Sequence, residues 1–221
     1  MASRGDRKVK VPIGDARDPD GLWVWTQRHL EWLRVRSYSP RTVRMREVYL
    51  GYFLVWCDAR SIARPTELTR PILERYQAHL FMPRKRDGKP LSLTSQIGRV
   101  TAVRSIFGWL ARQNAILSNP ASDLELPRGE RRLPRHVLTP AEADVVMAQP
   151  DVRDPIGVRD RAILETLYST GIRRFELIGL KTHDLDADRG TLMVRLGKGK
   201  KDRVVPIGER ALVWVEKYVR E

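Results

Sequence analysis

The segment from residue 114 to residue 136 most constrains the fold, because it divides the chain into two parts of different character. Proline and glycine recur in it and its apolar residues show no helical period, which predicts an extended linker. The chain has 221 residues, enough for two small cores at about 100 to 150 residues per domain. We therefore expect one domain at 18–113 and a second at 137–221.

The part before the linker carries apolar residues every three or four positions. This predicts helices at about 22–36, 40–57, 71–80 and 94–113. Ser39 followed by Pro40 is typical of a helix start, since serine can cap the first amides and proline suits the first helical turn. We predict a compact four-helix domain, preceded by a loose arm at 1–20. Its second helix should bury one apolar face: Val43, Leu50, Phe53, Leu54 and Cys57.

The part after the linker mixes helices with a hairpin. A capping box at Thr139 opens a first helix, and a second, at about 158–170, ends at Gly171. A short helix should follow at 174–180, then strands at 191–196 and 203–207, then a last helix at 209–219. This order predicts an α+β domain. Tyr168 and Tyr218 lie in helical segments and are expected to pack inward.

The positive charge is concentrated in the first part of the chain. The net charge is +14, and residues 1–113 carry 22 Lys and Arg against 10 Asp and Glu, which leaves +2 for the rest. Such a surface suits a polyanion, because each neutralised phosphate releases counterions. Alternatively, the many arginines reflect coding bias and are simply solvated. An anionic membrane is disfavoured as the partner because no basic amphipathic helix with a lipid-seeking face stands out. We predict binding to double-stranded DNA. The candidate contacts are Arg99, Arg104, Arg84, Lys85 and Arg86, followed by Arg41 and Arg44.

Several classes of protein are disfavoured by what the sequence lacks. Cys57 is the only cysteine, so no intrachain disulfide is expected. There is no secretory signal and no apolar run near the roughly 18 residues of a membrane helix, which favours a cytoplasmic protein. The histidines have no metal-ligand spacing, and we expect neither a metal nor a cofactor.

Two basic residues in the second part could bind a phosphate together. Arg173 follows the helix-ending Gly171, and Glu176, three residues later, lies on the same helical face and could hold its orientation. Lys198 lies at the tip of the predicted hairpin, in Gly-Lys-Gly-Lys-Lys. Arginine offers a planar donor fork to phosphate oxygens, and lysine adds a point charge or a proton. Taken singly, each could also be an ordinary solvated surface residue.

Together and in this order, these features resemble the tyrosine recombinase (phage integrase) family, particularly its Xer-like and integron-like members. The resemblance covers nearly the whole chain. It is carried by Ser39-Pro40-Arg41-Thr42-Val43, Asn119-Pro120-Ala121, Leu138-Thr139-Pro140-Ala141-Glu142, Tyr168-Ser169-Thr170-Gly171-Ile172-Arg173 and the hairpin from Gly197 to Pro206.

The resemblance implies a fold and a chemistry. The fold would be a four-helix, SAM-like core-binding domain followed by the first part of a catalytic domain. Arg173 would hold a non-bridging oxygen of the scissile phosphate, Lys198 would protonate the leaving 5′ oxygen, and Glu176 would be a supporting residue. A tyrosine would form a 3′-phosphotyrosyl link, without a metal or a cofactor.

Two departures from the family pattern matter. Arg174 and Phe175 stand where a small residue commonly precedes the glutamate, although the three-residue spacing to Glu176 favours Arg173 as the catalytic arginine. Only 23 residues follow Lys198, and they contain no His-x-x-Arg and no tyrosine in the nucleophile's motif. The nucleophile is therefore expected to lie outside this chain, and apolar surface should be exposed where later helices would pack.

Two interpretations follow. In the first, the chain is the amino-terminal portion of a site-specific DNA recombinase whose activity belongs to a longer polypeptide. In the second, it is a shortened relative that binds recombination-type sites without cutting them, as a regulator or the remnant of a mobile element. Both predict salt-sensitive DNA binding led by the first domain. Other recombinase protomers on adjacent half-sites are the protein partners that the resemblance implies.

Overall fold

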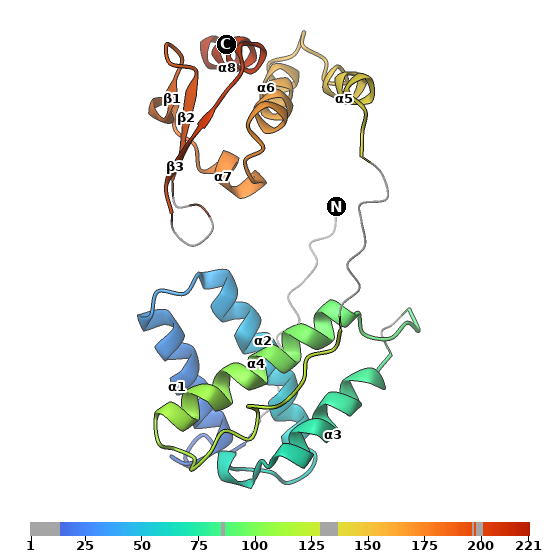
Figure 1. Ribbon diagram of the computed structural model, residues 1–221, viewed down its shortest axis with the longest axis vertical. Helices are drawn as coiled ribbons and strands as arrows, with labels where there is room; N and C mark the ends of the chain where they lie inside the picture. Colours follow the sequence, from blue (N-terminus) through green and yellow to red (C-terminus); the bar gives the residue numbers. More distant parts are fainter. Residues whose placement is uncertain (1–13, 85–86, 129–136, 196, 198–200) are drawn as a thin grey trace. The chain divides into compact units, whose positions relative to one another are not determined.

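The computed structural model describes residues 14–84, 87–128, 137–195, 197 and 201–221. Lys85, Arg86 and Lys198, three of the predicted functional residues, lie outside these ranges. The chain separates into two compact units, residues 1–131 and residues 132–221 (Figure 1). The fold class is as predicted, mostly helical with a small antiparallel sheet in the second unit.

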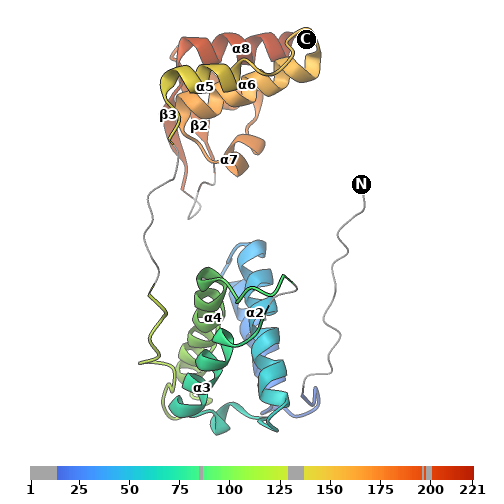
Figure 2. The ribbon, with the colours of Figure 1, turned by 90° about the vertical axis from the view of Figure 1, so that its right-hand side faces the viewer.

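The first unit is built from helices alone among its described residues (Figure 2). Its second helix starts as predicted, since the Ser39 hydroxyl accepts a hydrogen bond from the Thr42 amide at 3.2 Å. Ser92 caps the fourth helix in the same way through the Ser95 amide. The elements are α1 (Leu22–Val35), α2 (Pro40–Asp58), the 3-10 turn η1 (Pro65–Glu67), α3 (Arg70–Phe81) and α4 (Leu93–Arg112).

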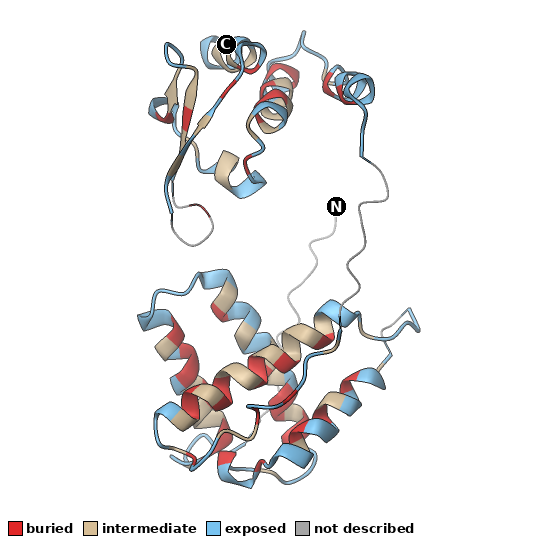
Figure 3. Cartoon of the chain, viewed as in Figure 1, coloured by how far each residue is buried: buried red, intermediate tan, exposed pale blue. Residues whose placement is uncertain are grey.

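The core of this unit lies where the apolar pattern predicted it (Figure 3). All five residues of the predicted α2 face are buried. Phe53 lies at its centre, with its ring centroid 4.8 Å from that of Tyr76 and 6.3 Å from that of Phe107, both in edge-to-face geometry. Edge-to-face pairs add specific attraction to the burial of apolar area, so this cluster holds α2, α3 and α4 together.

The predicted linker is wrong for its first half. Ile116, Ala121 and Leu124 are buried in the first unit's core, at 8%, 0% and 3% exposure. The Gln77 side chain on α3 donates a hydrogen bond to the Glu125 carbonyl at 2.8 Å, which holds the segment against the unit. The pattern was missed because three apolar residues in a chain of turns have no helical or strand period.

The second unit has the predicted order of elements with additions that the sequence did not indicate. A three-stranded antiparallel sheet has the order β1-β2-β3, and Thr191 pairs with Pro206 in the hairpin. The short first strand and the turn before it were not predicted. The elements are α5 (Pro140–Met147), α6 (Pro155–Thr170), α7 (Arg174–Ile178), the 3-10 turn η2 (Thr182–Asp184), β1 (Leu185–Asp186), β2 (Thr191–Val194), β3 (Arg203–Pro206) and α8 (Glu209–Arg220).

Both ends of α6 are set by residues next to the helix in the sequence. The helix begins three residues earlier than predicted, because the Asp154 side chain caps it by accepting from the Ile156 amide, with Pro155 at its first position. It ends at Gly171 as predicted, and Gly171 has a φ of 62°, a left-handed conformation that favours glycine. The residue that follows the cap is therefore turned away from the helix axis.

The buried face of α6 differs from the prediction. Tyr168, expected inward, is 56% exposed, whereas Glu165 is only 1% exposed. The Glu165 carboxylate accepts hydrogen bonds from Arg161 on its own helix at 3.0 Å and from Arg210 on α8 at 2.8 Å. Because two guanidinium groups neutralise this carboxylate, it can lie beneath α8. The arginine that makes this possible is 45 residues away in sequence.

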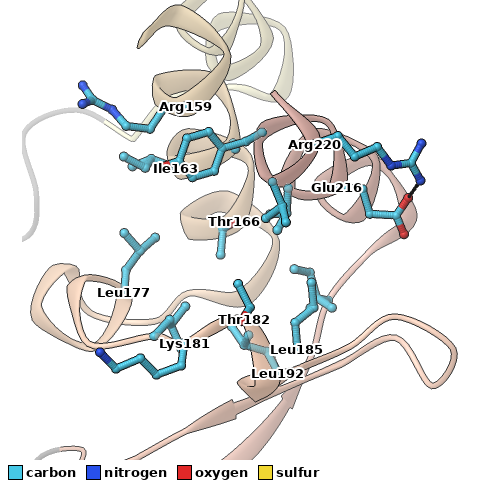
Figure 4. Close-up of a pocket in the computed structure, with 16 residues that line it drawn as sticks. Arg159, Ile163, Thr166, Leu177, Lys181, Thr182, Leu185, Leu192, Glu216 and Arg220 are labelled. Carbon is cyan, nitrogen blue, oxygen red and sulfur yellow. Dashed lines mark hydrogen bonds and ion pairs between the residues drawn. The ribbon is translucent and has the colours of Figure 1, made fainter. Parts of the chain in front are cut away.

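An apolar groove lies between α6, α8 and the sheet of the second unit (Figure 4). Its volume is about 360 Å³. Tyr218, which was expected to pack inward, lines the groove and is 45% exposed, and Val219 beside it is 58% exposed. The groove is one of several places where the second unit exposes apolar side chains. Other lining residues are Ile163, Leu177, Leu185, Leu192 and Val215.

Candidate phosphate-binding site and DNA-binding residues

Glu176 organises the turn that carries Arg173. Arg173 is the N-cap of α7, and its backbone amide donates to Glu176 Oε2 at 2.9 Å. The Arg173 guanidinium also donates, from Nη1 to Glu176 Oε1 at 3.0 Å. One carboxylate therefore holds both the backbone and the side chain of Arg173, as the spacing predicted.

A second arginine, on β3, grips the same carboxylate. Arg203 donates from Nη1 to Glu176 Oε1 at 3.1 Å and from Nη2 to Oε2 at 2.7 Å. This two-pronged geometry is the strong form of the arginine–carboxylate pair. The sequence did not indicate Arg203 as a site residue. Its position showed only that it would lie on the strand after the lysine turn.

The two arginines keep Glu176 ionised. The Glu176 side chain is 7% exposed. The pKa of its carboxyl is lowered to about 2, first by the Arg203 side chain and then by the Arg173 amide. Two guanidinium charges and one carboxylate leave the cluster with a net positive charge at neutral pH. The Arg173 side chain is 60% exposed, so it can meet an anion from solvent while it contacts Glu176.

The hairpin of Lys198 reaches this cluster through its described flanks. The Gly197 amide donates to the Lys201 carbonyl at 3.0 Å, which closes the turn around the residues between them. A Cβ placed on Gly197 would lie 2.8 Å from Arg203 Nη1 and 3.1 Å from Glu176 Oε1. The turn therefore starts in contact with the Glu176 carboxylate.

The neighbouring Arg174 has a different environment. Its Cζ atom lies 4.6 Å from the centroid of the Phe175 ring. A guanidinium over an aromatic face is held by cation–π attraction. Of the two adjacent arginines, Arg173 is the one whose guanidinium donates to Glu176.

Two of the predicted DNA contacts in the first unit are engaged within the protein. Arg99 was expected to point outward, and this is wrong: it is half-buried, with Cζ 3.8 Å from the centroid of the Tyr52 ring on α2. Its Nε atom is buried with no hydrogen-bond partner among the described residues. Arg104 is also half-buried and donates from Nη2 to the Ser122 carbonyl at 3.5 Å.

The other described candidates are exposed. Arg41 and Arg44 lie at the start of α2, and both are exposed. Arg84 is exposed as well, and it donates to the carbonyls of Phe81 and Met82 at 3.1 and 3.2 Å, which folds it back over the end of α3. Among the candidates in described positions, Arg41, Arg44 and Arg84 are exposed, whereas Arg99 and Arg104 are half-buried.

The described ranges, 14–84, 87–128, 137–195, 197 and 201–221, contain neither a metal-type cluster nor a membrane-spanning helix. No group of three or more His, Cys, Asp or Glu side chains in those ranges is placed to hold a metal ion. In the same part of the chain, no helix combines the length and the apolar character that crossing a bilayer requires.

The sequence is similar to known recombinases over its whole length. The model of the phage integrase family matches residues 136–221. Tyrosine recombinase XerC 2 of Ralstonia nicotianae is 51% identical over 224 residues, which cover 100% of this chain and 63% of that protein. Tyrosine recombinase XerC of Pelobacter propionicus is 36% identical over 193 residues, covering 86% of this chain and 60% of that protein. The chain thus spans less than two thirds of the length of these curated relatives.

Solved structures share the fold. The integrase of the Tn1549 transposon, in complex with transposon right end DNA, has a TM-score of 0.64 and 18% identity, covering 89% of this chain and 65% of that one. A lambda integrase dimer bound to a COC′ core site has a TM-score of 0.62 and 17% identity, covering 87% of this chain and 62% of that one. The structures show the shared fold, and the family match with the 51% identity to a tyrosine recombinase shows that the chain belongs to the phage integrase family of tyrosine recombinases.

Proposed function

We propose that this chain supplies the DNA-binding and phosphate-binding parts of a site-specific tyrosine recombinase. The observation that carries the proposal is the cluster of Arg173, Glu176 and Arg203, with the lysine turn starting against it. The cluster is cationic and its carboxylate is already neutralised, so a phosphate diester entering it would be attracted by Arg173. The nucleophilic tyrosine would come from a polypeptide region outside these 221 residues.

The residues would divide the work of strand cleavage. Arg173 would donate hydrogen bonds to a non-bridging oxygen and stabilise the charge that grows there in the transition state. The attacking tyrosine oxygen would form a bond to phosphorus while the bond from phosphorus to the 5′ oxygen breaks, and Lys198 would give that oxygen a proton. Glu176 would keep Arg173 oriented. A second strand's hydroxyl would then resolve the 3′-phosphotyrosyl link.

The cleavage proposal is tested on a polypeptide that continues the reading frame beyond Glu221. It should form a covalent protein–DNA adduct with a supercoiled target. Arg173→Ala should reduce adduct formation by about a hundredfold or more, the usual cost of removing a preorganised donor to a developing anion. An extended polypeptide that forms no adduct, or an Arg173→Ala variant that forms it at the normal rate, would contradict the proposal.

The first unit would bind duplex DNA, as the concentration of positive charge at residues 1–113 suggests. The Tn1549 and lambda integrases named above are bound to DNA in their structures. We assign the DNA-binding role to the segment 18–113, together with the buried stretch that follows it to Leu124. Function on DNA places the protein in the cytoplasm, and other protomers on adjacent half-sites are its proposed protein partners.

The structure changes the order of the candidate DNA contacts. Each phosphate contact contributes about 0.9 to the slope of log affinity against log salt. Arg41→Gln combined with Arg44→Gln should flatten that slope by about two units. The pair Arg99 and Arg104, for which the sequence predicted a similar effect, should give a smaller change, because both side chains are half-buried whereas Arg41 and Arg44 are exposed.

A matched control is available in the second unit. Arg153 and Arg159 are surface arginines, each paired with a neighbouring aspartate. Changing both to glutamine removes the same charge as the Arg41/Arg44 change but should leave the slope unchanged. An equal effect from both double variants would show that net charge, rather than the start of α2, sets the binding.

A further inference from the structure

Among the described arginines of the candidate site, Arg203 donates the most side-chain hydrogen bonds to another protein group. Both of its terminal nitrogens donate to Glu176, at 3.1 and 2.7 Å. Arg173 contacts the same carboxylate through one terminal nitrogen only, and its side chain is more exposed, 60% against 37%. One arginine is therefore arranged to hold the carboxylate and the other to meet a ligand.

The contact joins two segments that are distant in the sequence. Glu176 belongs to α7 and Arg203 to β3, 27 residues apart in sequence. Gly197, where the lysine turn begins, leaves room for this contact, since a Cβ there would lie 2.8 Å from Arg203 Nη1. The Arg203–Glu176 pair thus ties β3 to the turn that carries Arg173, with Gly197 beside it.

We propose that Arg203 is a positioning residue of the phosphate site, holding Glu176 so that the Arg173 loop, β3 and Gly197 keep one fixed arrangement. The proposal rests on the proposed function of the site. It requires the planar fork of arginine, because a lysine at the same place offers a single ammonium and cannot bridge both carboxylate oxygens. Charge alone at position 203 would then be insufficient.

The test uses the 221-residue chain in solution with two nuclear magnetic resonance readouts. The first is the pKa of the Glu176 carboxyl, followed with labelled glutamate. The second is amide hydrogen exchange at Arg173 and Gly197, whose amides donate to Glu176 Oε2 and to the Lys201 carbonyl. Loss of stability alone would speed exchange at protected amides throughout the second unit, so faster exchange confined to Arg173 and Gly197 separates positioning from simple stability.

The control is Arg195→Gln. Arg195 follows β2 in the same hairpin and binds a different carboxylate, that of Asp184, at 2.5 Å. Arg203→Gln and Arg195→Gln therefore remove equal charge and one carboxylate contact each from the same hairpin. Only the first should disturb the Arg173 loop.

We expect Arg203→Gln to raise the pKa of Glu176 from about 2 toward its ordinary value of 4.5. Exchange at the Arg173 and Gly197 amides should become at least about tenfold faster, which corresponds to about 1.4 kcal/mol less protection. Arg195→Gln should change either rate less than about twofold. If Arg203→Gln unfolds the second unit, Arg203→Lys is used in its place. It should also speed exchange at the Arg173 amide, because lysine lacks the two-pronged guanidinium that bridges both oxygens of Glu176.

Three results would overturn the proposal: unchanged exchange at the Arg173 amide in Arg203→Gln, equal effects of the Arg203 and Arg195 changes, or an Arg203→Lys variant that behaves like the unaltered chain. Salt-dependent DNA binding by the unaltered chain is measured separately. Its absence would count against the proposed function and would not alter the outcome of the exchange experiment.

Discussion

His29 should make the first unit sensitive to mild acid. Its ring is fully buried, and neither nitrogen has a hydrogen-bond partner among the described residues. It lies against the rings of Trp32 and Trp109, with centroids 5.8 and 5.1 Å away. Burial, followed by the positive charges of Arg46 and Arg112, lowers the pKa of His29 from 6.5 to about 4. The folded state therefore holds this ring neutral.

The sign and size of the change in stability follow from the difference between the pKa of His29 in the folded and unfolded chain. Between pH 6.5 and pH 4 the unfolded chain binds a proton at this residue and the folded chain does not, so stability falls as the pH falls. The loss is about 2 kcal/mol at pH 5 and approaches about 3 kcal/mol near pH 4, as an order of magnitude. This is a large part of the 5 to 15 kcal/mol that is typical, as a rough range, of a whole domain.

The assay is urea unfolding followed by tryptophan fluorescence at pH 7.5 and pH 5. Five of the six tryptophans lie within residues 1–113, so the signal reports mainly on the first unit. His29→Phe keeps an aromatic ring and removes the titrating group. The unaltered chain should lose about 2 kcal/mol more than this variant between the two pH values. Equal losses would refute the reasoning, since His29 would then not titrate differently in the folded and unfolded states.

Three further substitutions test the packing of the units. Arg210→Gln removes a donor to the buried Glu165 carboxylate and should lower the stability of the second unit by about 1–2 kcal/mol in a calorimetric melt; an unchanged melt would mean that Arg161 alone satisfies that carboxylate. Gly157→Ala should cost about 2–3 kcal/mol or more, because its Cβ would lie 1.9 Å from a backbone carbonyl oxygen. Gly51→Ala, where nothing lies within 4 Å of the added Cβ, should instead stabilise the first unit by about 0.5–1 kcal/mol. Similar melts for the two alanine variants would contradict the clash at Gly157.

Local patterns predicted the elements well where a residue acts on its near neighbours. The cap at Ser39, the capping box at Thr139 and the glycine end of α6 all formed as expected. The pairing of Glu176 with Arg173 was predicted for the same reason, since three residues along a helical turn bring two side chains together.

Predictions failed where a distant residue decides the outcome. Glu165 is buried and Tyr168 is exposed because Arg210 and Arg161 neutralise the carboxylate beneath α8. Arg99 is half-buried because α2 offers it the face of Tyr52. The stretch from Ile116 to Leu124 joins the first core although it has no periodicity, since a buried loop needs matching apolar pockets rather than a repeat.

The linear order of residues by itself indicated the family, the helical first unit and the contact between Arg173 and Glu176, since these depend on spacings of a few residues. The tertiary structure alone decided that Arg203 crosses from β3 to hold the same carboxylate. Hairpin register and strand direction set where that guanidinium points, and both arise from pairing between segments rather than from propensities within them.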